Sequence, residues 1–170
     1  MTDAYLSLGS NIEPERHLRA ALAALRKRFG EVRVSPVYRT AAVGFEGEDF
    51  LNLGARIDSD LQPVELNDWL HALENTHGRR RDGPRYSSRT LDIDIVLYGD
   101  RVLRGPGHLK IPRADLRHAF VLKPLADIAP DTVVPGDGRT LGQLWAAHPD
   151  HGKAFATVHL DAGSGDGREG

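Results

Sequence analysis

Two carboxylates, Asp92 and Asp94, lie two residues apart inside an otherwise apolar run. The alternation of residue types in this run has the period of two that is typical of a β-strand. One face of the strand is predicted to hold the apolar residues Leu91, Ile93, Ile95 and Leu97. The opposite face is predicted to hold both aspartates with Val96 and Tyr98, the two aspartate Cα atoms being roughly 6.5–7 Å apart.

Two carboxylates at this spacing can share one site, but they repel each other unless a cation lies between them. The chain has no cysteine, and none of its eight histidines shows the spacing of a ligand pair. Hard oxygen ligands of this kind favour Mg²⁺ or Mn²⁺ over zinc. The alternative is that both acids pair with arginines on an exposed face, although an acid pair inside an apolar strand is unfavourable if it is only structural.

Upstream of the aspartates the chain becomes strongly basic, with Arg79, Arg80, Arg81, Arg85 and Arg89 in one aperiodic stretch. Guanidinium groups match phosphate oxygens through two parallel hydrogen bonds. Alone, the stretch is equally typical of a solvated charge run or an RNA-contacting loop. Beside two acids, it favours a polyphosphate bound as its magnesium complex. The sequence contains neither a Walker A loop nor a dinucleotide-binding glycine fingerprint, so a nucleotide would be bound by another structure.

The elements that must position these residues alternate in type along the chain. Apolar patterns predict strands at 4–8, 32–38, 50–57 and 91–98, with Gly9-Ser10-Asn11 as a turn after the first. Helical spacing predicts helices from Pro14 to Gly30 and from Pro63 to Gly78. The order β-α-β-β-α-β predicts an α+β fold of ferredoxin-like type, an antiparallel sheet with both helices on one face. The other face is then free to carry a site with Phe50, Asn52 and the aspartates.

The rest of the chain is predicted to add a hairpin around 102–111, one or two helices within 112–128, and a helix capped by Thr140. We expect a single domain over residues 1–162 and a disordered, glycine-rich tail at 163–170. The net charge of −2 gives no general reason to expect a nucleic-acid or membrane partner. No apolar run is long enough to span a membrane and the N-terminus has no secretory pattern, so we expect a cytoplasmic protein.

Six short motifs between Ala4 and Pro135 carry a family resemblance. They are Gly9-Ser10-Asn11, Tyr38-Arg39-Thr40, Phe50-Leu51-Asn52, Gly78-Arg79-x-Arg81, Arg85-Tyr86-x-x-Arg89-Thr90-Leu91-Asp92-Ile93-Asp94-Ile95 and Ala119-Phe120-Val121-Leu122-x-Pro124-Leu125. In this order they resemble the 6-hydroxymethyl-7,8-dihydropterin pyrophosphokinases of folate synthesis. The family has a ferredoxin-like core, binds ATP with two Mg²⁺ ions, and transfers a pyrophosphoryl group to the hydroxymethyl oxygen of the pterin, releasing AMP.

The resemblance implies a role for each matching residue. Asp92 and Asp94 would hold both metal ions and, with Arg81 and Arg89, form the catalytic set. The ATP-binding set would comprise His71, Glu74, Arg81, Arg85, Arg89 and Ile95, with Arg113 or Arg117 in a segment that cannot be aligned uniquely. The pterin-binding set would comprise Thr40, Val43, Phe50, Asn52, Tyr86, Asp92 and Phe120, with Phe50 and Phe120 on the two faces of the ring.

Three departures from the family pattern accompany these matches. Ala41 and Ala42 stand where prolines are frequent, Tyr86 stands where tryptophan is frequent, and the segment 113–118 is one residue shorter. The altered segment 113–118 leaves open another magnesium-dependent phosphotransferase or nucleotidyltransferase with a changed acceptor. An RNA-binding module is a second alternative, since a ferredoxin-like sheet with an exposed aromatic residue and a basic loop can bind single strands. Under the leading hypothesis the partners are ATP and the pterin alone, with no nucleic acid and no membrane, and the protein is a monomer.

Overall fold

The computed structural model describes residues 1–41, 48–78 and 90–160 of the chain. A main antiparallel sheet runs through these residues in the strand order β5-β1-β4-β3-β8, with β2 also paired to β4. Its strands are β1 (Thr2–Ser10), β2 (Arg33–Val34), β3 (Val37–Thr40), β4 (Phe50–Ser59), β5 (Asp92–Tyr98) and β8 (Thr157–Val158). The helices between them are α1 (Pro14–Phe29) and α2 (Pro63–Thr76). The order of the four core strands confirms the predicted ferredoxin-like arrangement.

The predicted first strand was too short at its C-terminal end. β1 continues through Gly9 and Ser10, which pair with Asn52 and Leu51 of β4, so Gly9 is a strand residue and not part of a turn. The predicted strand 32–38 is interrupted at Pro36, which lacks an N–H for the ladder. Beside the break, Ser35 N donates to Gly54 O at 2.9 Å, and Gly54 N donates to the Ser35 hydroxyl at 2.8 Å.

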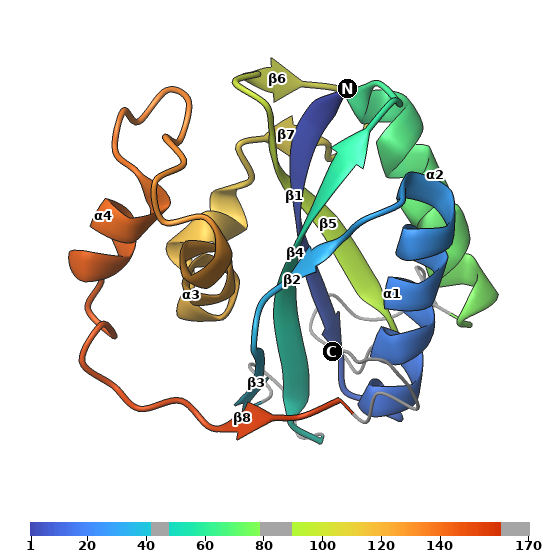
Figure 1. Cartoon of the computed structure of the whole chain (residues 1–170), viewed down its shortest axis with the longest axis horizontal. Coiled ribbons are helices and arrows are strands. Elements are labelled where there is room, and N and C mark those ends of the chain that lie inside the picture. Colours follow the sequence, from blue (N-terminus) through green and yellow to red (C-terminus); the bar gives the residue numbers. More distant parts are fainter. Residues whose placement is uncertain (42–47, 79–89, 161–170) are drawn as a thin grey trace.

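One face of the sheet packs on α1 and α2, as predicted (Figure 1). The buried residues on this side are Leu6, Leu8, Leu53, Ile57, Ile93 and Ile95 from the strands, with Leu18, Leu22, Leu25, Leu66 and Leu70 from the helices. Their alternation in the strands and their helical spacing in α1 and α2 explain why the two layers meet here. At its start α2 is capped by Gln62 and Glu65, each side chain meeting the other's backbone.

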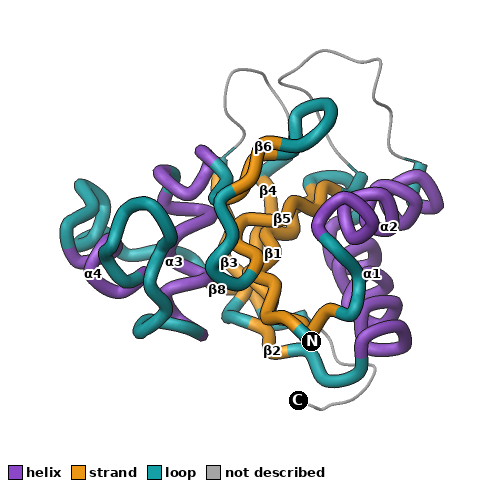
Figure 2. The backbone as a smooth tube through the Cα atoms, turned by 90° about the horizontal axis from the view of Figure 1, so that it is seen from above, coloured by secondary structure: helices purple, strands orange, loops and turns teal. Residues whose placement is uncertain are grey.

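The opposite face is not wholly free, which corrects the prediction. Helix α3 (Ala119–Ile128) lies against it, and a second buried cluster forms around Tyr5, Leu122 and Leu125. Figures 1 and 2 show α3 and α4 (Leu141–Ala146) on the side of the sheet away from α1 and α2. Gly54 permits the close approach of α3, since a Cβ there would lie 2.8 Å from Leu125 Cδ2. Only the part of this face beyond α3 can carry a site.

The alternation in β5 changes partway along the strand. Leu6 of β1 pairs with Ile95, but its neighbour Tyr5 pairs with Leu97, so Val96 is an extra residue in β5. Leu97 consequently joins the cluster under α3, and Tyr98 joins the core under α1 and α2. The predicted faces are therefore correct from Leu91 to Ile95 and wrong for Leu97 and Tyr98.

The elements after β5 largely follow the prediction. The hairpin is formed by β6 (Leu103–Arg104) and β7 (Lys110–Ile111), and a 3₁₀ turn (Ala114–Arg117) precedes α3. Thr140 caps α4 by accepting a hydrogen bond from Gln143 N at 3.0 Å. Strand β8, which pairs with the outer edge of β3, has no counterpart in the prediction. The predicted tail at 163–170 lies outside the described residues, and the domain limits 1–162 stay a prediction.

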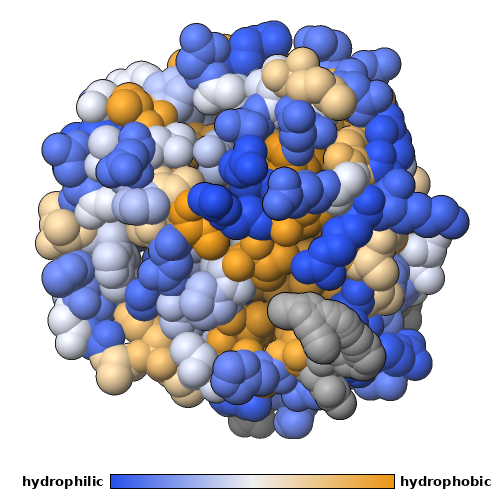
Figure 3. Space-filling model, in the orientation of Figure 1, coloured by the Kyte–Doolittle hydropathy of each residue, from blue (hydrophilic) through white to orange (hydrophobic). Residues whose placement is uncertain are grey.

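Hydrophilic side chains cover most of the face shown in Figure 3, with apolar surface gathered along its middle, between the α1 and α3 sides. Among the residues that the structure describes, no helix has the length and apolar character needed to cross a membrane.

Candidate active site

Asp92 and Asp94 face the same side of the sheet, toward the layer that contains α3. In β1, Gly9 pairs with Asp92 and Ser7 pairs with Asp94, so each carboxylate stands beside a residue with a small side chain or none. Ile93 and Ile95, which alternate with them, are buried on the helix side. The strand thus projects two acids onto a partly open surface, as the alternation predicts.

The electrostatic surroundings of Asp94 are unfavourable to its charge. Burial and the neighbouring Asp92 carboxylate raise the pKa of Asp94 well above its usual range, and Glu74 and Asp115 act in the same direction. One Arg113 nitrogen, 3.6 Å from Asp94 Oδ1, opposes this rise. Two carboxylates that repel each other and are partly exposed form a suitable site for a cation.

Arg113 is held beside the aspartates by its own segment. Its backbone N donates to Val96 O at 3.0 Å, and its Nε donates to Asp115 Oδ2 at 3.1 Å. Arg117 lies one 3₁₀ turn later, with an exposed side chain and its carbonyl oxygen 2.8 Å from His148 Nε2. Of the two arginines that the sequence could not separate, the structure brings Arg113 to the aspartates. Asp115, which orients it, was not predicted.

A polar group lies on the same sheet surface, one strand further from the aspartates. Asn52 of β4 is buried and pairs across the sheet with Gly9 of β1. Its Nδ2 donates to Thr40 Oγ1 at 2.7 Å, which joins two of the residues predicted to bind a pterin. Phe50 lies opposite Thr40 in the β3–β4 ladder and is partly exposed.

Phe120 occupies the first turn of α3 and is also partly exposed. The His118 ring stacks on it, with ring centroids 5.1 Å apart and planes 9° from parallel. His118 was not among the predicted site residues, since no spacing in the sequence distinguishes it from the other histidines. The His118 imidazole therefore packs against Phe120, one of the two aromatic rings expected to hold the substrate.

The chain is similar to known proteins of one family. Residues 5–130 match the family described as 7,8-dihydro-6-hydroxymethylpterin-pyrophosphokinase (HPPK). The chain belongs to this family. Among HPPK relatives, the 2-amino-4-hydroxy-6-hydroxymethyldihydropteridine pyrophosphokinase of Pseudomonas aeruginosa is 45% identical over 154 residues, covering 87% of this chain and 93% of that protein. The protein of the same name from Haemophilus influenzae is 36% identical over 156 residues, covering 89% and 96%.

Solved HPPK structures share the fold. A crystal structure of an HPPK-DHPS protein in complex with substrates has a TM-score of 0.66 at 13% identity, and the match covers 86% of this chain. Wild-type HPPK-DHPS of Plasmodium falciparum with SDX-DHP has a TM-score of 0.64 at 15% identity, with the same coverage. In both cases this chain spans 43% of the solved chain. At these identities the likeness concerns the fold alone.

Helix α2 carries the next pair of predicted HPPK residues, of which Glu74 contacts β5. Glu74 is buried, and its Oε2 accepts a hydrogen bond from Ile93 N at 2.6 Å. His71 lies one turn earlier and is partly exposed. Ile95, also predicted to contact ATP, has its side chain buried among the helices, so only its backbone could meet a ligand. The remaining predicted residues, Val43, Arg81, Arg85, Tyr86 and Arg89, lie outside the described residues.

The donor set suits magnesium. Within the described ranges, no three His, Cys, Asp or Glu side chains are gathered as a possible metal site. Asp92 and Asp94 therefore supply two carboxylates at most, which is the number that Mg²⁺ commonly takes when substrate phosphates and water complete its shell. Burial and the adjacent Asp92 carboxylate raise the pKa of Asp94, so a cation bound beside the two acids would favour their charged forms.

A separate hollow of about 640 Å³ lies at the start of α1. Its walls are formed by Asn11, Glu13, Pro14, Glu15, Arg16, Arg19, Arg39, Glu48, Asp49 and Leu51. Leu51 belongs to the core under α1 and α2, so this hollow lies on the side of the sheet away from the aspartates. Acidic and basic side chains both line it, so its charge favours no particular class of ligand.

Proposed function

We propose that this HPPK transfers the pyrophosphoryl group of ATP to 6-hydroxymethyl-7,8-dihydropterin, releasing AMP, as a step of folate biosynthesis. Membership of the family and the high identity to named pyrophosphokinases support the reaction. The observation that carries it is the placement of Asp92, Asp94, Asn52 and Thr40 on one sheet surface. A metal-bound triphosphate and a hydrogen-bonding heterocycle could lie side by side there.

Asp92 and Asp94 are the proposed ligands of two Mg²⁺ ions, which when bound would neutralise phosphate charge and polarise the phosphorus that reacts. Arg113 would lie over the same phosphates because its backbone and Asp115 fix it beside Asp94. The proposed ATP set further includes Arg81, Arg85 and Arg89, the backbone of Ile95, and His71, Glu74 and Arg117. Catalysis would rest on positioning and charge stabilisation, without a protein nucleophile.

The acceptor would lie between Phe50 and Phe120, with Thr40 and Asn52 at its polar edge and Val43 and Tyr86 beside it. The amide of Asn52 offers a donor and an acceptor to a ring whose own groups alternate in the same way. The hydroxymethyl oxygen forms a bond to the β-phosphorus as the bond from that phosphorus to the bridging α,β-oxygen breaks. The bridging oxygen leaves with AMP, and the hydroxyl proton passes to solvent.

The test is a product assay with ATP, Mg²⁺ and 6-hydroxymethyl-7,8-dihydropterin. We expect AMP and the pterin pyrophosphate in equal amounts. Turnover should fall by roughly 10²–10³-fold in Asp92→Ala and in Asp94→Ala, since each removes charge stabilisation at the reacting group. Circular dichroism should show that both variants stay folded. Formation of ADP, or full activity in both variants, would refute the assignment.

The two other hypotheses give different results in the same experiment. An RNA-binding sheet needs an open face for bases to stack on, whereas here α3 lies across much of that face. Magnesium-independent binding of a single-stranded RNA would nevertheless favour that module. ATP turnover that does not depend on the pterin would favour a phosphotransferase with a changed acceptor.

We further propose that the enzyme works as a cytoplasmic monomer. The absence of cysteine from the sequence is compatible with a reducing compartment. Light scattering should then give the mass of one 18.7 kDa chain. A mass of twice that value at assay concentrations would contradict the monomer.

A further inference from the structure

Gly9 lies at the centre of the polar surface, between the two ligand-binding ends of the proposed site. In the sheet it pairs with Asn52 of β4 on one side and with Asp92 of β5 on the other. A side chain at this position would project onto the same surface as the side chains of Asn52 and Asp92, because directly paired residues of neighbouring strands share a face. Gly9 is therefore part of the floor of the site.

The backbone at Gly9 does not explain the glycine. Gly9 lies inside β1 and is not among the glycines with positive φ, so any L-residue could adopt its conformation. A glycine inside a strand usually makes the fold less stable than a residue with a side chain would. The explanation must therefore be the space above its Cα.

That space is taken by the amide of Asn52. A Cβ built on Gly9 would lie 2.8 Å from Asn52 Oδ1, closer than carbon and oxygen can pack, and 3.9 Å from Asn52 Cγ. Leu51 O lies at 3.8 Å, and no atom of Asp92 is among the three nearest atoms. A methyl group at Gly9 would thus push on Asn52 and spare the metal-binding side.

Asn52 cannot yield without losing a contact. Its side chain is buried, at 6% exposure, and its Nδ2 is bound to Thr40 Oγ1 at 2.7 Å. With Nδ2 fixed on Thr40 and Oδ1 resting over Gly9, the amide has one orientation. Displacing Oδ1 would rotate the amide and break or lengthen the bond to Thr40.

We propose that Gly9 is a positioning residue for pterin recognition: the missing side chain lets the Asn52 amide lie over β1 in the orientation that Thr40 fixes. The inference rests on the proposed function, since it takes the pterin as the ligand of Asn52. Gly9 itself touches no reacting atom. Its effect on the reaction passes entirely through Asn52.

The chain supplies a matched control, Gly54, which stands on the same sheet face and pairs with Ser7 in β1. A Cβ at Gly54 would meet α3, at 2.8 Å from Leu125 Cδ2 and 3.2 Å from both Leu125 N and Pro124 Cβ. Gly54→Ala should therefore lower the melting temperature and leave ligand affinity of the folded protein unchanged. Gly9→Ala should instead weaken the binding of the pterin.

The experiment measures equilibrium binding of 6-hydroxymethyl-7,8-dihydropterin in the presence of Mg²⁺ and α,β-methylene-ATP, an analogue whose α,β-bridge cannot be cleaved. In Gly9→Ala the pterin affinity should fall by roughly tenfold to hundredfold, the range for a misplaced hydrogen-bonding group. The affinity for the magnesium nucleotide should stay within about twofold of wild type. The melting temperature should fall as well, because the displaced amide loses its bond to Thr40, so the selective loss of pterin affinity is the diagnostic result.

A double-mutant cycle separates this role from a general disturbance of the site. Asn52→Ala removes both the amide and the clash, so adding Gly9→Ala to it should have no further effect on pterin affinity. An equal loss in both backgrounds, or an equal loss of magnesium nucleotide and pterin affinity in Gly9→Ala, would overturn the inference alone. Failure of the wild type to bind the pterin would instead refute the proposed function, and the inference with it.

Discussion

Asp94 shows at the scale of a single residue how function opposes stability. Burial and Asp92 raise the pKa of its carboxyl group, so the charged form is disfavoured in the folded protein relative to the unfolded chain. For an acid with a raised folded pKa, folding stability is lost as the pH rises from the unfolded value through the folded one. At neutral pH, which lies above the unfolded value, Asp94 therefore destabilises the metal-free protein, as is common for groups in active sites.

Asp94→Asn should stabilise the metal-free protein while it abolishes turnover. The amide keeps the shape of the side chain and removes the repelling charge, and Arg113 retains its contact with Asp115. We expect a gain of about 1 kcal/mol, which for a chain of this size corresponds to a rise of about 2–4 °C in the melting temperature. Calorimetry in the presence of a chelator measures it.

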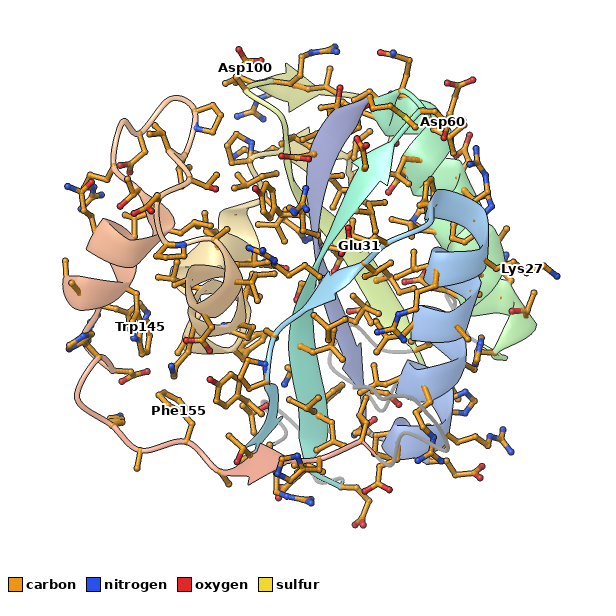
Figure 4. All side chains as sticks on the ribbon, in the orientation of Figure 1. Lys27, Glu31, Asp60, Asp100, Trp145 and Phe155 are labelled. Carbon is orange, nitrogen blue, oxygen red and sulfur yellow. The ribbon has the colours of Figure 1, made fainter. Side chains whose placement is uncertain are left out.

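The control for this substitution is Asp100→Asn, two residues after β5, where the side chain is exposed (Figure 4). It should change neither stability nor turnover measurably. A melting temperature of Asp94→Asn below that of the wild type would show that the Arg113 contact outweighs the repulsion.

Residue types and spacing were sufficient to place Asp92, Asp94 and Asn52 on one face of the sheet, because strand alternation fixes which side chains share a face. They could not identify Asp115 or separate Arg113 from Arg117, because the segment around them has no period and turns through a 3₁₀ helix. Gly9 was taken for a turn residue for a related reason. The sequence does not show whether a glycine is needed for its backbone conformation or for the space that a side chain would fill. Only the packing around the glycine distinguishes the two.

At the scale of elements, a histidine pair joins α1 to the end of α2. His17 Nδ1 lies 2.6 Å from Nδ1 of His77, so one ring must donate and the other accept. Burial lowers the pKa of both rings, Arg16 lowers both further, and Glu13 partly opposes this at His17. His17 also lowers the pKa of His77. The hydrogen bond therefore requires that one of the two Nδ1 atoms carries no proton.

The free energy of unfolding should fall as the pH drops below about 6.5, the ordinary pKa of histidine. Below that value the unfolded chain binds protons that the folded pair resists, so protons favour unfolding. The stabilisation is present above the unfolded pKa and is lost as the pH falls through the lowered folded pKa. Urea titrations between pH 5 and pH 8 measure the slope.

The double variant His17→Gln/His77→Gln is the control, since glutamine can still hydrogen-bond but does not titrate in this range. Its stability should vary less with pH between 5 and 7. An unchanged slope would assign the pH dependence to other groups.

A second junction ties the C-terminal segment to the sheet. Phe155 packs edge-on against Tyr38, with centroids 6.1 Å apart, and lies 5.9 Å from Trp145 of α4 (Figure 4). Lys123 of α3 stands over the Tyr38 ring at 5.2 Å and forms an ion pair with Asp127 at 3.0 Å. These contacts hold β8, α3 and α4 together beside the outer edge of β3.

Phe155→Ala should destabilise the protein by about 1–2 kcal/mol, less than a fully buried phenylalanine would, since this ring is partly exposed. Nucleotide affinity should not change, because the ring packs on Tyr38 of β3, and β1 and β4 separate β3 from the strand of the aspartates. Chemical denaturation measures the loss. His151→Ala, which removes an exposed ring 5.8 Å from Trp145, should have little effect, and equal losses in both variants would contradict this account.

The sequence predicts the long elements well, because each repeats its apolar pattern often enough to show a period. It does not predict β8, whose two residues have no period and depend on the exposed edge of β3. It also does not reveal that α3 lies across the second face of the sheet. The apolar stripe of a helix shows that the helix is covered, but not which surface covers it.

At the scale of the whole molecule, the sheet lies between two helical layers of unequal extent. Helices α1 and α2 cover one face, while α3 and α4 lie over the other (Figure 2). Asp92 and Asp94 are partly exposed on this second face, so a ligand that binds there should stabilise the entire fold. The nucleotide should do so only together with Mg²⁺, because its phosphates and the aspartates repel each other without the metal.

Saturation at about a hundred times the dissociation constant should add about 2.7 kcal/mol to the free energy of unfolding. Magnesium with α,β-methylene-ATP should therefore raise the melting temperature by about 5–10 °C, and removal of the metal with a chelator should abolish the rise. Thermal unfolding followed by fluorescence measures it. Asp92→Ala should show no rise under either condition, and an equal rise without metal would refute a magnesium-dependent site.

The strand that carries the aspartates lies at one end of the sheet, since β5 pairs with β1 alone among the residues that the structure describes. Such a strand offers unpaired backbone groups to any other chain, and flat edges of this kind seed aggregation. Here the Glu74 carboxylate accepts a hydrogen bond from Ile93 N, and Arg113 N donates one to Val96 O. The residues that surround the proposed phosphate site thus also protect the edge, so substituting Glu74 would expose β5 to self-association as well as alter the site.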